Sequence, residues 1–253
     1  MTMPALEGVK SADRAMAILE IFRAARTPLA ARDIAEQLAM PRSSTNVLLR
    51  SMIQGGYLRY DEAGSFYYPT LRVFHLGSWL AEGLLDDPDM DHMLQRLRDE
   101  TGETVCLWAR VGMGLTAMQI LESNQAIKLH FGTGVHAPLF GSTVGAAMLA
   151  GLPDDVVDAL AARHQARKVT NNTAPLDLKA LRLDIARDRH RGHALGYDRW
   201  LADAGAVAVS ILPPGADEPL VVGVGGPNYR VRRNEAAIIA ALTQARDSFA
   251  QTA

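Results

Sequence analysis

The beginning of the chain carries apolar side chains at the spacing of an amphipathic helix. Ser11 precedes a polar turn, as residues that cap helices do. Apolar residues then recur at positions i, i+3, i+4 and i+7, namely Ala15, Ile18, Leu19 and Phe22. We therefore predict a first helix that ends near Arg26.

Two more short helices are predicted after a break at Thr27-Pro28. Residues 31–39 have the pattern of a helix that turns Ile34, Ala35 and Leu38 inward. Pro41 suits the first position of a third helix, because its φ is fixed and no N–H is needed there. This third helix is expected to run to about Gln54 and to pack through Val47, Leu48, Met52 and Ile53.

Two aromatic runs, residues 57–60 and 65–68, flank a turn that contains Asp61 and Gly64. Short runs of this kind around an Asp and Gly turn are typical of a β-hairpin. Three helices followed by a hairpin is the order of a winged helix-turn-helix, which we predict for residues 1–69.

The rest of the chain predicts a connector and a second domain. Residues 70–85 have helical spacing and are expected to form a linker helix, and residues 86–253 form the second domain. That domain begins with a helix that reaches 101–102 and continues with short β-type runs at 104–111, 115–121, 126–130, 207–212 and 220–224. Helical stretches are predicted at 143–149, 154–164, 176–191 and 234–249, so the fold class is α+β.

Composition narrows the class of protein. The 253 residues are 48% hydrophobic and 21% charged, which is typical of a globular protein. The single cysteine, Cys106, excludes an internal disulfide and a zinc cluster of several cysteines, and it fits a reducing compartment. We expect a cytoplasmic protein, because the sequence contains no membrane-spanning stretch and Met1 to Lys10 does not have the layout of a signal peptide.

Charge becomes informative only when it is read by region. The net charge of −2 does not by itself suggest a nucleic-acid partner. Residues 1–80 nevertheless carry nine Lys and Arg against seven Asp and Glu, whereas the remainder carries 17 against 21. The small basic surplus therefore lies in the first 80 residues, which contain the predicted winged helix.

The start of the third helix has the side chains that a DNA-reading helix needs. Arginine can bond two acceptors of guanine, asparagine can pair with adenine, and serine or threonine can reach bases or phosphates. A solvated, well-capped helix start is the alternative interpretation, and the adjoining helix, turn and hairpin favour DNA binding. The predicted DNA-binding residues are Arg42, Ser43, Ser44, Thr45, Asn46 and Arg50.

Several short sequences, taken in order, resemble the IclR family of bacterial transcriptional regulators. In the first half they are 10–15, Asp33-Ile34-Ala35-Glu36, 40–44 and Gly56-Tyr57-Leu58. In the second half they are Gly102-Glu103-Thr104-Val105, Pro138-Leu139 with Gly145 and 147–150, and Gly226-Pro227 with Arg230. The resemblance spans nearly the whole chain.

This resemblance implies a winged-helix DNA reader joined by a linker helix to a GAF-like domain that binds a small organic effector. It also implies a homodimer or homotetramer on palindromic operator DNA. The chain departs from the family in several places. Ala39 stands where the turn often has glycine, and Val47 stands where the third helix often has arginine. Phe140 and Ala146 replace a frequent histidine and lysine near the ligand loop, and Ala208 replaces a frequent cysteine or serine.

An apolar pocket with a few polar groups is the usual form of a small-molecule site. In a GAF-like fold we expect Ser142 and the adjacent N–H groups at a helix start to hold a carboxylate. Phe140, Tyr197 and Trp200 replace smaller polar residues and favour an aromatic or otherwise flat effector, although each is also compatible with ordinary core packing. The predicted effector-binding residues are Trp108, Met118, Gly141, Ser142, Thr143, Tyr197, Trp200 and Ser210.

Two other function classes stay open. The α/β half could be a small-molecule enzyme, or the winged helix could bind a protein partner. The sequence does not contain a nucleophile elbow of the G-x-S-x-G type, and we expect no catalytic residues, no metal site and no cofactor. A ligand-responsive regulator that is not an enzyme is therefore the first hypothesis.

Overall fold

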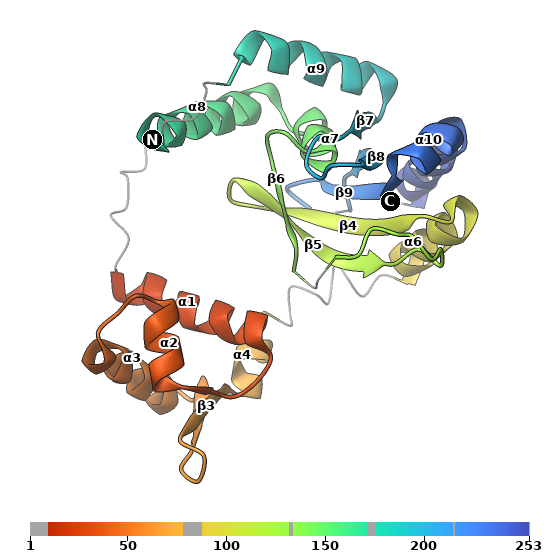
Figure 1. The fold of residues 1–253 in the computed structure, drawn as a ribbon. Coiled ribbons are helices and arrows are strands. Elements are labelled where there is room, and N and C mark those ends of the chain that lie inside the picture. The colour runs from red at the N-terminus through yellow and green to blue at the C-terminus, as the bar shows by residue number, and fades with distance from the viewer. Residues whose placement is uncertain (1–9, 78–87, 132–133, 172–175, 215, 253) are drawn as a thin grey trace. The chain divides into compact units, whose positions relative to one another are not determined.

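The chain forms two compact units, Met1–Asp86 and Asp87–Ala253, each with its own apolar core. The computed structural model describes residues 10–77, 88–131, 134–171, 176–214 and 216–252 (Figure 1). The second half of the predicted linker helix, from residue 78 onward, lies outside the described residues. The mixed α+β class predicted from the sequence is confirmed.

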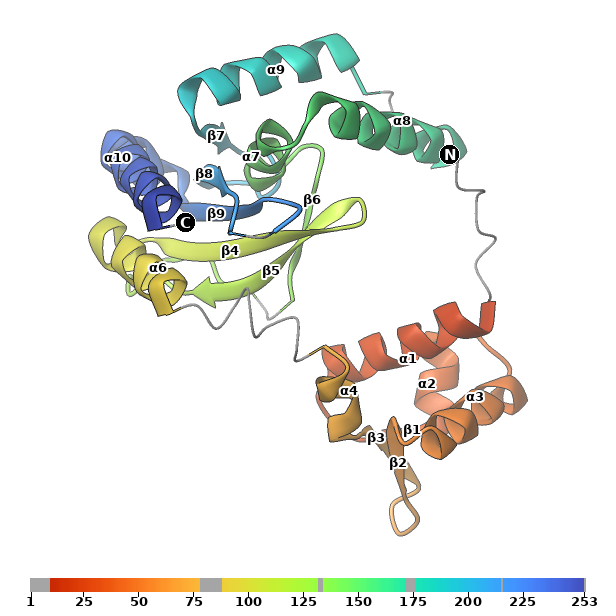
Figure 2. The same ribbon diagram turned by 180° about the vertical axis from the view of Figure 1, so that it is seen from behind.

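The first unit is a winged helix-turn-helix. Its three helices are α1 (Lys10–Ala25), α2 (Ala31–Gln37) and α3 (Arg42–Gln54). The predicted hairpin is formed by β2 (Leu58–Asp61) and β3 (Phe66–Pro69), and it projects from the helices (Figures 1 and 2). A two-residue strand that the sequence pattern did not predict, β1 (Leu29–Ala30), pairs with β3 and completes an antiparallel sheet in the order β1-β3-β2.

The inward face of α3 differs from the predicted one. Thr45, Leu49 and Met52 are buried, whereas the side chain of Val47 is 61% exposed. Positions 45, 49 and 52 follow the i, i+4, i+7 spacing of one helix face, but a threonine at the first of them hides that spacing from a pattern based on apolar residues. The apolar core of this unit consists of Ile18, Phe22, Ile34, Leu49, Met52 and Leu58.

The turn between α2 and α3 contains an alanine in a backbone conformation that favours glycine. Ala39 has a φ of 49°, the left-handed region that favours glycine, so its Cβ is accommodated at some cost. Pro41 stands one position earlier than expected, at the N-cap of α3, with a φ of −59°. The helix therefore begins at Arg42.

Only the start of the predicted linker helix is described. Helix α4 (Leu71–His75) follows the hairpin, and the Thr70 hydroxyl caps it by accepting a hydrogen bond from the Arg72 N–H at 3.3 Å. The same hydroxyl donates to the Gly56 carbonyl, which ties the start of α4 to the end of α3.

The second unit is built on a six-stranded antiparallel sheet in the order β6-β5-β4-β9-β8-β7. The strands are β4 (Thr104–Val111), β5 (Gly114–Leu121), β6 (His136–Pro138), β7 (Ala194–Tyr197), β8 (Ala204–Ile211) and β9 (Leu220–Pro227). The short edge strands β6 and β7 were not predicted. Residues 126–130, which were predicted as a strand, form an irregular segment instead.

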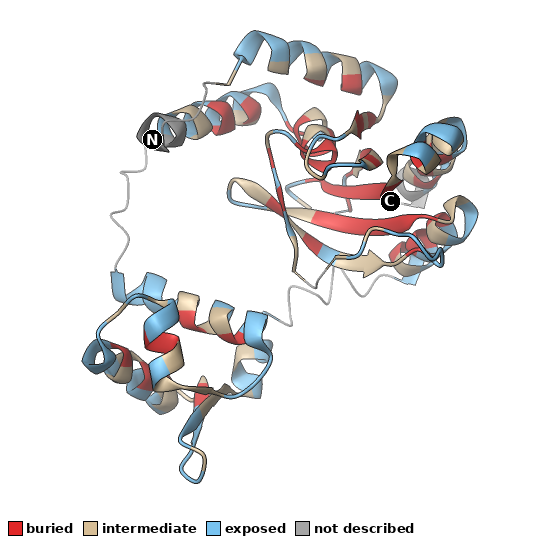
Figure 3. Cartoon of the chain, viewed as in Figure 1, coloured by how far each residue is buried: buried red, intermediate tan, exposed pale blue. Residues whose placement is uncertain are grey.

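Helices cover both faces of this sheet. Helices α6 (Pro88–Thr101) and α10 (Asn228–Thr252) lie together on one face, and α7 (Thr143–Gly151) packs on the other (Figure 1). Helix α9 (Leu178–Arg191) packs on α7, and α8 (Asp154–Asn171) precedes α9 in the chain. Figure 3 shows the buried residues concentrated on β4, β9 and α7, where the core lies. No helix of the described segments is long and apolar enough to cross a bilayer.

Candidate DNA-binding surface and effector cavity

The N-terminal turn of α3 presents polar side chains to solvent. Arg42, Ser43 and Ser44 in this turn are exposed, and Asn46, which follows, is half-buried. Arg50 is also exposed and lies about two turns further along the helix. Neither Arg42 nor Arg50 forms an ion pair with a carboxylate in the described part of the chain. Two cations of α3 without carboxylate partners, together with the hydroxyl and amide groups at the start of the same helix, form a surface suited to phosphates and base edges.

Thr45 does not belong to this surface, although it was predicted to. Its side chain is fully buried, and its hydroxyl donates to the Pro41 carbonyl at 3.2 Å. Because positions 45, 49 and 52 face the core, Thr45 holds the start of α3 in place instead of facing solvent. The structure therefore corrects this assignment.

The wing carries a cation that the sequence analysis did not select. Arg59 on β2 is exposed, and its guanidinium lies over the Tyr68 ring at 5.4 Å. Arg59 was recognisable in the sequence as the one charged residue of the aromatic run 57–60. Asp61 begins the wing turn and accepts a hydrogen bond from the Ala63 N–H at 3.2 Å.

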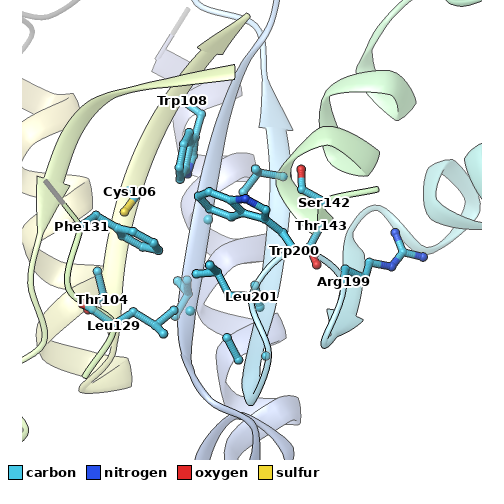
Figure 4. A pocket seen from close by; sticks show the side chains of 17 residues that line it. Thr104, Cys106, Trp108, Leu129, Phe131, Ser142, Thr143, Arg199, Trp200 and Leu201 are labelled. Atoms are coloured by element: carbon cyan, nitrogen blue, oxygen red, sulfur yellow. The ribbon is translucent and has the colours of Figure 1, made fainter. Parts of the chain in front are cut away.

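A cavity of about 60 Å³ lies on the α7 side of the second sheet (Figure 4). Its walls come from β4, β8, β9, the start of α7 and two connecting segments, one between β5 and β6 and one between β7 and β8. The lining is largely apolar and consists of Thr104, Cys106, Trp108, Leu129, Phe131, Ser142, Thr143, Val144, Arg199, Trp200, Leu201, Ala204, Gly205, Ala206, Gly223, Val224 and Gly225.

Four of the eight residues predicted to bind effector line this cavity. They are Trp108 on β4, Ser142 and Thr143 at the start of α7, and Trp200 in the segment after β7. These residues are far apart in the sequence, and the sheet topology brings them together.

The other four lie elsewhere, for reasons of strand geometry. Met118 is the extra residue where the register of β4 and β5 shifts, and it is 44% exposed. The Tyr197 ring packs against Gly205 and α10, where its hydroxyl donates to Glu235. Ser210 shares a face of β8 with Ala206 but lines a separate cavity further along the strand. Gly141 precedes the cavity wall with a φ of 102°.

The sequence analysis missed two sets of lining residues. Thr104 and Cys106 precede Trp108 at the period-two spacing of one strand face, a signal that was available in the sequence. Leu129 lies in the segment 126–130 that was predicted as a strand, and Phe131 follows that segment directly. That segment is tied down by the Thr104 hydroxyl, which donates to the Leu129 carbonyl at 3.0 Å.

The polar groups at the start of α7 differ in whether they already have a hydrogen-bond partner. The Ser142 hydroxyl donates to the Pro138 carbonyl at 2.6 Å and accepts from the Gly145 N–H at 2.9 Å. Ser142 is therefore a helix cap whose hydrogen is already used. The Thr143 hydroxyl forms no hydrogen bond with a described residue, and the N–H groups of Thr143 and Val144 have no acceptor within the helix.

The one thiol of the chain lies inside this cavity. Cys106 is 3% exposed, and burial raises the pKa of its thiol to about 12. A thiol with this pKa is neutral near pH 7 and is a weak nucleophile. Cys106 therefore contributes a soft apolar surface to the cavity wall.

Three aromatic rings pack at one end of the cavity. Phe131 and Trp200 are stacked, with ring centroids 5.8 Å apart and an interplanar angle of 10°. Trp108 meets both rings edge-on, at 6.3 Å from Phe131 and 6.1 Å from Trp200. The rings come from three different segments of the chain, so their packing closes this end of the cavity (Figure 4).

Comparison with known families matches both units. The family model described as IclR helix-turn-helix domain matches residues 11–62. The model described as bacterial transcriptional regulator IclR C-terminal matches residues 88–250, which is more than half of the chain.

The chain belongs to the IclR family of bacterial transcriptional regulators.

Individual IclR relatives are distant but match over most of their length. The Acetate operon repressor of Salmonella typhimurium and the Transcriptional repressor IclR of Escherichia coli are each 25% identical over 234 residues, covering 91% of this chain and 84% of the relative. A crystal structure of an IclR family transcriptional regulator from Brucella abortus superposes with a TM-score of 0.72 at 22% identity and covers all of this chain and 95% of its own. The IclR of Thermotoga maritima gives a TM-score of 0.63 at 18% identity.

The two family matches assign the α3 surface and the cavity to different domains of an IclR regulator. The exposed start of α3 belongs to the helix-turn-helix domain of a transcriptional regulator, and the apolar cavity belongs to the IclR C-terminal domain. The fold predicted from the sequence, a winged helix followed by an α/β domain, is the fold of the solved IclR structures.

Proposed function

We propose that this IclR-family regulator binds palindromic operator DNA through the start of α3 and changes its DNA affinity when a small molecule occupies the cavity of the second unit. The observation that carries the proposal is the exposure of Arg42 and Arg50 without carboxylate partners in the described residues. Arg42, Ser43, Ser44, Asn46 and Arg50 are the proposed DNA contacts.

The proposed effector carries a carboxylate that binds at the start of α7. Unpaired N–H groups at a helix start, reinforced by the helix dipole, favour an anion. The Thr143 hydroxyl lines the cavity and can donate one further hydrogen bond. The remaining wall is apolar, so the rest of the effector is expected to be apolar as well.

Binding rather than turnover is the proposed role of this cavity. The Ser142 hydroxyl is used in capping α7, and the Thr104 hydroxyl donates to Leu129 and accepts from the Ser123 N–H at 3.2 Å. The high pKa of Cys106 disfavours its thiolate. These commitments leave few groups for acid–base or nucleophilic chemistry, which favours a sensor over an enzyme.

The proposed assembly is a homodimer or homotetramer. A palindromic operator is matched by a protein with twofold symmetry, which addresses its two half-sites together. Two large apolar side chains on α4, Leu71 at 77% exposure and Phe74 at 67%, are candidates for a contact between copies. Light scattering of the purified protein measures the assembly, and replacement of both residues by serine is expected to shift it toward a smaller species.

The proposal is tested by binding of the full chain to the intergenic DNA beside its own gene. Fluorescence anisotropy should report saturable binding that weakens steeply between 50 and 200 mM salt, because phosphate contacts release counterions. A small carboxylic acid that raises the thermal midpoint of the protein should also change its apparent DNA affinity. Binding to unrelated DNA with equal affinity at every salt concentration would contradict operator recognition.

A further inference from the structure

Trp200 occupies space that a ring-shaped effector would need. An apolar cavity that binds benzene measures about 150 Å³, whereas this cavity measures about 60 Å³. The Trp200 indole stacks on Phe131 and meets the edge of Trp108. These aromatic rings therefore pack against one another and not around an empty space for a ligand ring. Their presence therefore does not indicate an aromatic ligand.

The other two bulky residues that favoured an aromatic effector, Tyr197 and Phe140, do not line the cavity. Tyr197 faces α10, where the Arg232 guanidinium lies 3.7 Å from its ring centroid. Phe140 packs on His164 with ring centroids 4.5 Å apart and does not line the cavity. Of the bulky residues that suggested a flat ligand, Trp200 alone lines the cavity, and it does so as part of the wall.

Backbone conformation and hydrogen bonds fix both ends of the segment that carries Trp200. Asp198 and Asp203 have φ values of 54° and 60°, in the left-handed region that residues other than glycine rarely adopt. The Asp198 carboxylate accepts from the Asp203 N–H and from the Asn228 amide, each at 2.7 Å. The Asp198 N–H donates to the Ala204 carbonyl at 2.9 Å.

Backbone strain of this kind persists only where surrounding contacts enforce it. The hydrogen bonds of Asp198 close the base of the loop 198–203, and the stacking on Phe131 fixes its inner side. Trp200 is therefore positioned as a fixed wall of the cavity, with Asp198 as the residue that positions it.

We infer that Trp200 sets the upper size of the molecule that this cavity admits, so that the effector is a compact carboxylic acid without a ring. The inference rests on the proposed function for the choice of a carboxylate. The size limit itself rests on the volume of the cavity and on the packing of Trp108, Phe131 and Trp200.

The test uses the full chain and two sets of probes. Acetate, pyruvate and butyrate represent compact acids, and benzoate and phenylacetate represent acids with a ring. Indole, which has the shape of the removed side chain and needs no anion site, is the third probe. Calorimetry and the shift of the thermal midpoint measure binding to wild type, to Trp200→Ala and to Asp198→Ala.

We expect wild type to bind a compact acid, with little affinity for benzoate or indole. Trp200→Ala should bind benzoate or phenylacetate at least tenfold more tightly than wild type, and indole should raise its thermal midpoint. Asp198→Ala should move in the same direction by a smaller factor, because it releases the loop while keeping the indole. Tyr197→Phe is the matched control, since it alters a neighbouring ring on the other face of the sheet.

The outcomes separate the two claims. Uptake of indole by Trp200→Ala, with no acid bound by either protein, supports the size limit and contradicts the proposed carboxylate effector. Equal binding of indole or benzoate by wild type and Trp200→Ala overturns the size limit, whichever acids bind. If Trp200→Ala does not fold, Trp200→Leu removes part of the ring and is expected to give the same order of affinities.

Discussion

Glu103 and Arg230 form a two-bond ion pair that joins the start of β4 to the start of α10. The Arg230 Nε donates to one carboxylate oxygen of Glu103, and the Nη2 donates to the other at 2.7 Å. Glu103 is 1% exposed, and the side chain of Arg230 is 16% exposed, so each charge depends on the other for compensation. Gly226 leaves room for this pair, because a Cβ there would clash with the Glu103 carboxylate that Arg230 holds in place.

Removal of one partner is expected to destabilise the second unit strongly. Glu103→Ala leaves the Arg230 guanidinium buried without its carboxylate and should lower the free energy of unfolding by about 3–5 kcal/mol. Urea unfolding followed by circular dichroism measures the change.

A double replacement provides the control for this prediction. Glu103→Met together with Arg230→Met removes both charges and should cost less than Glu103→Ala alone, because no buried charge stays unpaired. A double variant that is as unstable as the two single changes combined would show that the pair contributes mainly through its packing.

Cys106 gives a pH dependence with a definite sign. The thiol pKa is about 12 in the folded state and about 8.5 in an unfolded chain. Above about pH 8.5 the unfolded state therefore loses a proton that the folded state keeps, and stability falls as pH rises toward 12. Between pH 8 and pH 10 wild type should lose about 2 kcal/mol more than Cys106→Ala.

Reaction of the thiol with a disulfide reagent checks the same point independently. Native protein at pH 8 should react slowly, at a rate set by opening of the cavity, and urea-unfolded protein should react at once. Rapid reaction of native Cys106 would contradict its burial.

The positions of the strongly periodic helices and strands were predictable from the sequence. Which side of each helix or strand is buried was less predictable. Strands β4 and β5 were located to within a residue by their apolar runs, and α1 by its i, i+3, i+4 spacing. Thr45 was assigned to the wrong side of α3 because side-chain polarity does not reveal burial when a hydroxyl bonds its own helix. Short edge strands such as β7 carry too few residues for a pattern to be recognised.

The cavity was only half predictable for a related reason. Ser142 and Thr143 were found because they begin a helix after a loop, and a helix start is visible in a sequence. Tyr197 was misplaced because a strand residue one position from Gly196 faces the opposite side of the sheet. The shift of register at Leu107/Trp108, which displaces Met118, depends on the pairing of two strands and has no signal in either strand alone.

Replacement of Val47 by arginine is expected to increase DNA affinity. It is 61% exposed on α3, next to Asn46, where a cation would be free to reach a phosphate. Val47→Arg should therefore raise affinity for DNA of any sequence and steepen the dependence of log K on log salt by about one. Val47→Gln, which has no charge, is the control and should leave the slope unchanged. An unchanged slope for Val47→Arg would place position 47 away from the DNA backbone.

The central claim is that the start of α3 reads DNA, and the affinities of Arg42→Ala and Asn46→Ala for the intergenic operator test it most directly. Each change should weaken operator binding by about 1–3 kcal/mol and affect unrelated DNA less, because contacts to base edges carry sequence preference. Arg191→Ala, at an exposed arginine of α9, is the matched control and should bind as wild type does. Operator affinity that is unchanged in both α3 variants while the protein stays folded would contradict the account.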